Sequence, residues 1–158
     1  EKYLLDTLHS KRVLWLNNGF LQGDDTDSHI DTLARLCPDN TIVYVQCTDK
    51  EDVHYEALMR MEQELEEFRT LNGKPYRLLP LPMALPAYEG EERLPATYAN
   101  FLIINGAVLL PIYGTERDAI AVDVMKMAFP NHEIVTVNCS PLIRQHGSLH
   151  CVTMQYPE

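Results

Sequence analysis

The sequence has 158 residues, enough for one domain with a substantial core, and its 46% apolar and 23% charged content is typical of globular proteins. Its 13 basic and 23 acidic residues give a formal net charge of −10, which argues against a nucleic-acid partner because phosphate binding requires basic patches. No apolar run reaches the length of a membrane span and no signal peptide is visible, so we expect a cytoplasmic protein without a membrane partner.

An acidic stretch from Gly23 to Arg35, GDDTDSHIDTLAR, precedes the first predicted strand. Such a cluster is most often a polar loop built from Asx turns. Three of its aspartates are expected to shape that turn: Asp24, Asp25 and Asp27. If HID is extended, His29 and Asp31 point to the same face and share one site, whereas Ile30 points into the core.

The sequence from about Thr32 to Leu81 predicts the order strand, strand, helix, strand. Two β-rich runs, TLARLC and TIVYVQC, flank Pro-Asp-Asn, which is a hairpin signal. Apolar residues then recur at helical spacing between Asp52 and Leu71, and Gly73 supplies a stop signal. The run YRLLPL follows as a third strand.

A second unit with the same order is predicted from about Asn100 to Asn138. FLIINGAVLLPIY reads as a hairpin around Asn-Gly, RDAIAVDVMKMAF as a helix that ends before Pro130, and EIVTVN as a strand. The sequence therefore predicts an α/β fold with a repeated ββαβ unit. The Pro-rich segment between the units, residues 80–98, is expected to be a long surface loop.

Both ends of the chain look like strands without partners. RVLWL near the start reads as the last strand of a preceding unit, and SLHCVTMQ at the end as the first strand of a following one. We therefore expect the chain to form part of a larger ring-like arrangement, completed either by a homo-oligomer or by a missing N-terminal half.

Cys151 is the candidate nucleophile among the four cysteines, which form no C-x-x-C pair and predict a reduced protein. A lone cysteine is usually a buried structural thiol, and the other three are interpreted in that way: Cys37, Cys47 and Cys139. A nucleophilic cysteine requires a nearby histidine. On a strand His150 would face the opposite side, so His29 is the expected partner. A metal site that includes His146 is disfavoured, because residues four apart on a strand are separated by about 13 Å.

Three segments together resemble the agmatine deiminase family, also called the Porphyromonas-type peptidyl-arginine deiminase family: GDDTDSHIDTLAR, LPATYANFLIINGAVLLPIYG and PLIRQHGSLHCVTMQ. The resemblance implies the five-bladed α/β propeller of the guanidine-modifying superfamily. It places the family's H-I/V-D motif on His29 and Asp31 and the nucleophile of G-x-x-H-C on Cys151. Tyr98 and Asn100, in YANF, are implied to line the substrate pocket. Family members are longer, and the resemblance assigns this chain to their C-terminal half.

The resemblance also implies the reaction, which is hydrolysis of agmatine to N-carbamoylputrescine and ammonia without a metal or organic cofactor. Asp31 would hold the guanidinium through charge-assisted hydrogen bonds, and the Cys151 thiolate would attack its central carbon. His29 would protonate the departing ammonia and then activate the water that hydrolyses an amidino-cysteine intermediate. Ser28 stands where many agmatine deiminases have glycine. Arginine or peptidyl-arginine therefore stay open as substrates, as does an incomplete C-terminal fragment that only binds guanidinium.

Overall fold

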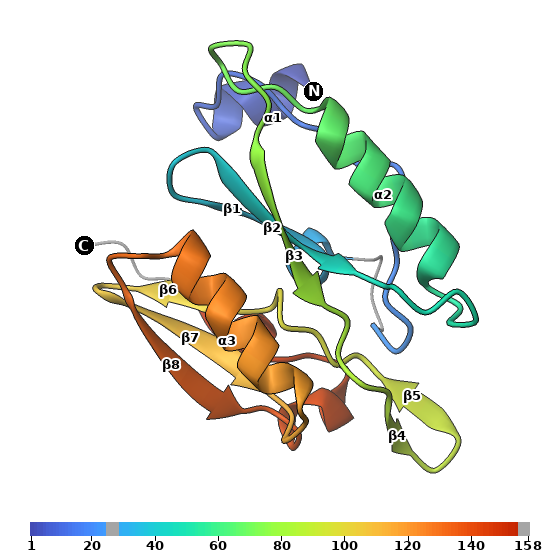
Figure 1. Ribbon diagram of the computed structural model, residues 1–158. Helices are drawn as coiled ribbons and strands as arrows, with labels where there is room; N and C mark the ends of the chain where they lie inside the picture. Colours follow the sequence, from blue (N-terminus) through green and yellow to red (C-terminus); the bar gives the residue numbers. More distant parts are fainter. Residues whose placement is uncertain (25–28, 155–158) are drawn as a thin grey trace.

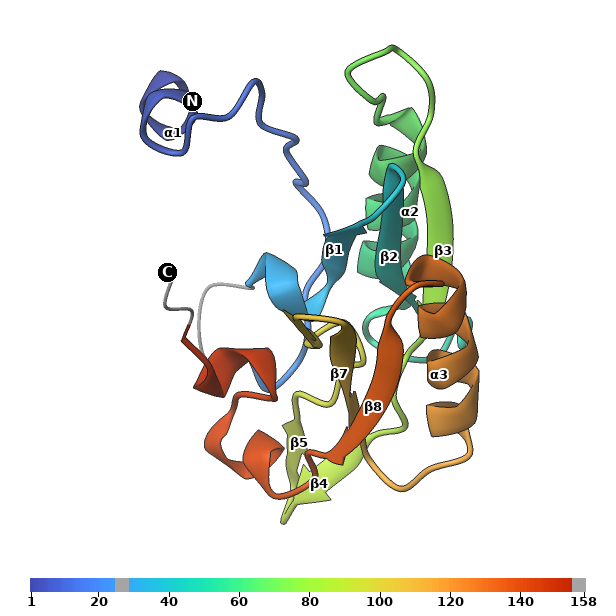
Figure 2. The same cartoon turned by 90° about the vertical axis from the view of Figure 1, so that its left-hand side faces the viewer.

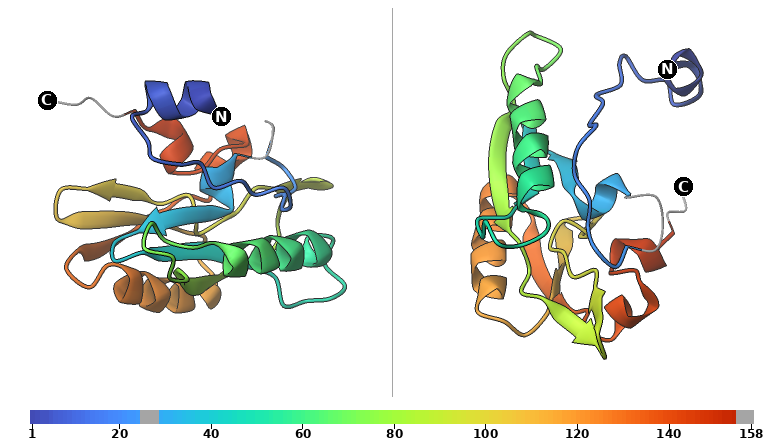
Figure 3. Two further views of the ribbon diagram at one scale, coloured as in Figure 1. Left: turned by 90° about the horizontal axis from the view of Figure 1, so that it is seen from above. Right: turned by 90° about the vertical axis from the view of Figure 1, so that its right-hand side faces the viewer.

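The computed structural model describes residues 1–24 and 29–154 and arranges most of them in two layers (Figure 1). Two three-stranded sheets form one layer, and two long helices that cover the same side of both sheets form the other (Figure 3). These helices are α2 (Tyr55–Glu67) and α3 (Arg117–Ala128). Within this part of the chain, no helix combines the length and the apolar character that a membrane span requires.

The first sheet consists of β1 (Ala34–Cys37), β2 (Thr41–Gln46) and β3 (Arg77–Pro82), in that order. β1 and β2 form an antiparallel hairpin whose turn residues, Asp39 and Asn40, both have positive φ, as short hairpin turns favour. After the crossover through α2, β3 runs parallel to β2. The apolar stripe of α2 is buried against this sheet: Leu58, Met61 and Leu65.

The second sheet repeats this arrangement with β6 (Leu102–Ile104), β7 (Ala107–Ile112) and β8 (Glu133–Asn138). The β6–β7 hairpin turns at Gly106, whose φ of +79° favours glycine, and β8 runs parallel to β7 after α3. Four residues of α3 are buried in the core: Ala121, Val124, Met125 and Ala128.

Both spans for which a repeat is predicted thus contain a strand, a strand, a helix and a strand. The α/β class is confirmed. In the core, α3 packs beside β3 as well as beside β8, so it joins the two units (Figure 1). Within the described residues the sheets are separate and do not close into a ring. The five-bladed propeller therefore stays a prediction.

The segment between the two units differs from the predicted surface loop. It contains a short hairpin of β4 (Ala87–Glu89) and β5 (Glu92–Leu94), and residues 94–101 that follow are all buried. Burial of this irregular backbone is tolerated because side chains satisfy its polar groups. The Tyr113 hydroxyl, for example, accepts from the Thr97 N–H at 3.0 Å and donates to the Thr97 carbonyl at 2.9 Å.

The strands predicted at the two ends are wrong. RVLWL lies in an irregular N-terminal arm that follows α1 (Lys2–Thr7), a helix without buried residues that stands apart from the sheets (Figure 2). The segment predicted as a C-terminal strand forms instead the 3-10 turn η3 (His150–Val152) after η2 (Leu142–Gln145). Neither segment has a neighbouring strand to pair with among the described residues, so nothing favours the extended form.

Candidate active site

Three short segments from distant parts of the chain meet on the side of the sheets away from α2 and α3. They are the 3-10 turn η1 (Ile30–Thr32), the buried segment that ends at Asn100, and η3. Figure 2 shows η1 in light blue and η3 in red on this side of the molecule. The polar residues that meet there are Asp31, Asn100, His150 and Cys151.

Asn100 lies at the centre of this group and is fully buried. Its side-chain oxygen Oδ1 accepts hydrogen bonds from the backbone N–H groups of His150 (2.8 Å) and Cys151 (3.3 Å), and from Sγ of Cys151 at 3.4 Å. Its Nδ2 donates to Oδ2 of Asp31 at 3.0 Å. Both ends of the amide are therefore used within the protein, so the resemblance-based prediction that Asn100 lines the substrate pocket is not supported.

His150 is paired with Asp31, since its Nδ1 lies 2.7 Å from Oδ2 of the carboxylate. Both side chains are partly exposed, at 31% and 19% respectively. The prediction that His150 faces away from the site is wrong because it assumed a strand. In the η3 turn, consecutive residues can both contact one group, and Asn100 contacts both His150 and Cys151.

His29 itself has an extended backbone, but it does not belong to an extended HID segment as predicted, because a 3-10 turn begins at Ile30. It is the N-cap of η1, with its backbone N–H donating to Asp24 at 3.2 Å and its carbonyl accepting from Thr32 Oγ1 at 2.6 Å. Because the turn follows directly, Ile30 is 55% exposed and does not enter the core. The shared face of His29 and Asp31 is therefore not confirmed, and the role of His29 as proton carrier stays a prediction.

Cys151 is the exposed thiol of the chain, and all four cysteines are free. A Cβ placed on Gly147 would come within 3.1 Å of Cβ of Cys151, so glycine gives this turn room to approach. The interpretation of the other cysteines as structural agrees with their burial, which raises the pKa of Cys37 to about 11 and also raises the pKa values of Cys47 and Cys139.

Arg35 is a cation that the sequence analysis did not assign to the site. Its guanidinium stacks over the ring of Phe101 at 4.7 Å, and Nη1 donates to the carbonyls of Phe101 (2.9 Å) and Ala99 (3.4 Å). Burial lowers its pKa, whereas the nearby groups of Asp31 and Cys151 act in the opposite direction. Its place at the end of the HIDTLAR run was the one available signal.

Tyr98 lies in the core and not at this site. Its ring is fully buried, and its hydroxyl donates to Oδ1 of Asp118 at 2.6 Å. Burial and the contact with this carboxylate raise the pKa of Tyr98, so the phenol stays protonated. The predicted pocket role of Tyr98 is therefore not supported. Three further residues named in the sequence analysis lie outside the described residues: Asp25, Asp27 and Ser28.

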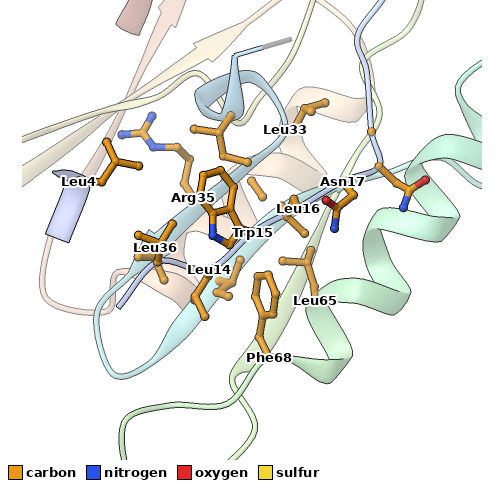
Figure 4. A pocket seen from close by; sticks show the side chains of 16 residues that line it. Leu4, Leu14, Trp15, Leu16, Asn17, Leu33, Arg35, Leu36, Leu65 and Phe68 are labelled. Carbon is orange, nitrogen blue, oxygen red and sulfur yellow. The ribbon is translucent and has the colours of Figure 1, made fainter. Parts of the chain in front are cut away.

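An apolar groove of about 620 Å³ begins beside η1 and runs along the N-terminal arm (Figure 4). Trp15 and Leu36 line it although they are 55% and 62% exposed, and Phe68 and Leu65 close its far side. Figure 4 shows Arg35 at the same groove, and its guanidinium also contacts the carbonyl of Ala99, the residue before Asn100. The groove itself holds few groups that could take part in proton transfer.

A family model and a known relative match almost the whole of this chain. The model of the Porphyromonas-type peptidyl-arginine deiminase matches residues 1–157. A candidate agmatine deiminase from Vibrio parahaemolyticus is 32% identical over 174 residues, which cover 99% of this chain and 48% of that protein.

Two solved structures are similar over almost the whole chain. A candidate arginine deiminase from Porphyromonas gingivalis has a TM-score of 0.96 and 58% identity, and the match covers 99% of this chain and 46% of that one. The agmatine deiminase of C. jejuni has a TM-score of 0.86 and 45% identity, over 95% of this chain and 44% of that one. The chain spans about half the length of the relatives that it matches. It belongs to the Porphyromonas-type peptidyl-arginine deiminase family, whose members are guanidine-modifying hydrolases.

Proposed function

We propose that the protein to which this chain belongs is an agmatine deiminase, which hydrolyses agmatine to N-carbamoylputrescine and ammonia with Cys151 as the nucleophile. The observation that carries this proposal is the hydrogen-bonded group in which one buried amide joins the carboxylate of Asp31 to the exposed thiol of Cys151. The choice of agmatine as the substrate follows from the relatives that are named as agmatine deiminases.

Asp31 is the proposed contact for the cationic guanidinium. Both donors to its carboxylate within the described residues, Nδ2 of Asn100 and Nδ1 of His150, lie on Oδ2. Oδ1 is therefore the oxygen on which a substrate N–H can be placed, by a charge-assisted hydrogen bond. The carboxylate is 19% exposed, which allows the substrate to reach it from solvent.

In the first half of the proposed reaction, the Cys151 thiolate adds to the guanidinium carbon. The C–N bond to an amino group then breaks, and that group takes a proton and leaves as ammonia. In the second half, water adds to the amidino-cysteine, the C–S bond breaks and the thiolate is restored. His29 is proposed to carry the proton in both halves. The fixed cation of Arg35 lies within electrostatic range of Cys151.

Arginine deimination is a second candidate, because the relative at 58% identity is named as a candidate arginine deiminase. A third is guanidinium binding without turnover, since the chain spans only about half of its relatives. Both alternatives place the guanidinium at Asp31 and Cys151. The second differs from agmatine deimination in its substrate, and the third in that no turnover occurs.

The test is ammonia release by the wild-type chain and by Cys151→Ala with agmatine, free arginine and an arginine peptide, alongside calorimetry with each compound. We expect release from agmatine that Cys151→Ala abolishes, with an unchanged circular dichroism spectrum. Release from arginine alone supports the second candidate, and heat of binding without ammonia supports the third. Turnover that survives in Cys151→Ala contradicts the covalent mechanism.

A further inference from the structure

We propose that Asn100 is the positioning residue of this site: its single buried amide holds the Cys151 thiol and the Asp31 carboxylate at a fixed separation. The inference rests on the proposed function, because it assigns Asn100 a part in the same reaction. Asn100 itself is fully buried, so it acts through these two residues and does not touch the substrate.

The hydrogen bonds define one orientation of the amide. Oδ1 faces the N–H groups of η3 and the sulfur, and Nδ2 faces the carboxylate of Asp31. A flipped amide would set an NH₂ group against two N–H donors and an oxygen against a carboxylate. Since the Asn100 amide is fully buried and the Asp31 carboxylate is only 19% exposed, each mismatch at the amide would cost the desolvation of an unpaired group. The side chain is therefore a rigid spacer between η1 and η3.

The backbone that carries Asn100 is fixed independently of the site. Oγ1 of Thr97 donates to the carbonyl of Thr32 at 2.7 Å and accepts from the N–H of Ala99 at 3.2 Å. This segment is thus tied to η1 twice, at Thr32 by Thr97 and at Asp31 by Asn100. Of these two contacts, only the one at Asn100 continues to Cys151, the proposed nucleophile in η3; His150 of η3 also contacts Asp31 directly at 2.7 Å.

The consequence concerns the approach of sulfur to the guanidinium carbon. If the cation is held on Asp31, its carbon meets the Cys151 sulfur only while η1 and η3 keep their spacing. Displacement of reacting atoms by about 1 Å can cost about 10²-fold in rate. Gln carries the same amide but on a side chain longer by one methylene, so it cannot keep the same spacing. Asp places a second carboxylate against Asp31, and Leu has a similar size but no polar atom.

The test compares Asn100→Leu with Thr97→Val, a matched loss of a buried polar contact on the same segment. The readouts are the Tm and the rate at which Cys151 is alkylated by neutral iodoacetamide and by the cationic chloroacetamidine, followed by peptide mass spectrometry. We expect wild type and Thr97→Val to react faster with the amidine. Asn100→Leu should lose that preference by about tenfold or more. It should also react at least about threefold faster with iodoacetamide, because its thiol has lost the Oδ1 acceptor.

Equal loss of Tm in the two variants with unchanged alkylation rates in both would overturn the positioning role and leave Asn100 as a structural residue. If Asn100→Leu does not fold, Asn100→Asp carries the test. It keeps the acceptor for η3 but repels Asp31, so it should lose the amidine preference, and retention of that preference contradicts the proposal. If wild type shows no preference for the amidine, only the proposed binding of guanidinium is contradicted. The positioning role of Asn100 is then still decided by the iodoacetamide rates of wild type and Asn100→Leu.

Discussion

Among the described residues, the pairs His54–Asp52 and His150–Asp31 have similar contacts and very different surroundings. In one, Nδ1 of His54 lies 2.5 Å from Oδ1 of Asp52, and the histidine is fully buried. In the other, Nδ1 of His150 lies 2.7 Å from Oδ2 of Asp31, and both side chains are partly exposed beside the Cys151 thiol. The same contact thus holds a loop in place in the first pair and lies next to the proposed nucleophile in the second.

The two pairs differ in how many of their polar atoms already have hydrogen-bond partners within the protein. Nε2 of His54 accepts the N–H of Gln22 at 2.9 Å, and its ring stacks on Phe20 with centroids 4.7 Å apart. Oδ2 of Asp52 accepts from Arg93 at 2.9 Å. The pair at His54 therefore ties the segment before η1 and the β4–β5 hairpin to the start of α2. In the pair at Asp31, both contacts to the carboxylate within the described residues are on Oδ2, and Oδ1 is the atom proposed to bind the substrate.

The largest effect on stability should follow from Asp52→Asn. Arg93 and Asp52 are only 10% and 13% exposed, so the substitution leaves a buried guanidinium without its counter-charge. Breaking such a pair costs about 3 kcal/mol or more in the free energy of unfolding, measurable by urea denaturation. Asp31→Asn is the matched change in the other pair. It should cost clearly less stability and instead remove guanidine turnover and the amidine preference of Cys151. Equal losses of stability in the two variants would remove the distinction between the pairs.

The fold was largely predictable because its information is local. The Pro-Asp-Asn and Asn-Gly turns, the apolar stripe of α2 and the stop at Pro130 each act over a few residues. The structure has the strands and helices of both units in the predicted order, although α2 is shorter than the predicted span of Asp52 to Leu71. The ends of the chain were not predictable in this way. RVLWL has the composition of a strand, but a strand also requires a neighbour to pair with.

Some residues of the candidate site could be predicted from the sequence, but their arrangement could not. Asp31 and Cys151 were identified through motif resemblance, and the structure brings both to the same amide. The place of His150 could not be derived, because its turn is held by Asn100, 50 residues earlier in the chain. Arg35 was missed for the same reason, since its partners are the carbonyls of Ala99 and Phe101. Contacts between distant segments leave no periodic signal in the sequence.

A smaller loss of stability should follow from His54→Phe. The new ring can keep the stacking on Phe20, but the Gln22 N–H and one oxygen of Asp52 lose their partner. A buried group left without its hydrogen bond costs about 1–3 kcal/mol, which urea denaturation can resolve. His150→Phe should change stability less, because the His150 ring is 31% exposed and water can replace it at Asp31. A larger loss in His150→Phe than in His54→Phe would contradict this order.

The smallest expected effect is the dependence of stability on pH, which tests the buried pair of His54 and Asp52 most specifically. Burial lowers the pKa of His54 below its ordinary value of 6.5, against the opposing effect of the Asp52 hydrogen bond. Nε2 also accepts the Gln22 N–H, so the folded chain holds the neutral ring. The unfolded chain therefore binds more protons, and this contribution is present above pH 6.5 and is lost as the pH falls below it, by at most about 1.4 kcal/mol per pH unit.

A second decline should follow at lower pH. Burial by itself would raise the pKa of Asp52, but hydrogen bonds from the His54 backbone, Arg93 and the His54 ring lower it to about 2. Its contribution is therefore present above the ordinary value of 3.8 and is lost as the pH falls from there toward 2. Urea denaturation from pH 8 to pH 3 should show both declines in wild type and in His150→Phe. In His54→Phe the decline below pH 6.5 should be reduced by the His54 contribution, because the ring that takes up the proton is gone. If the decline below pH 6.5 is as large in His54→Phe as in wild type, protonation of His54 is not what makes the stability of the fold depend on pH between 6.5 and about 4.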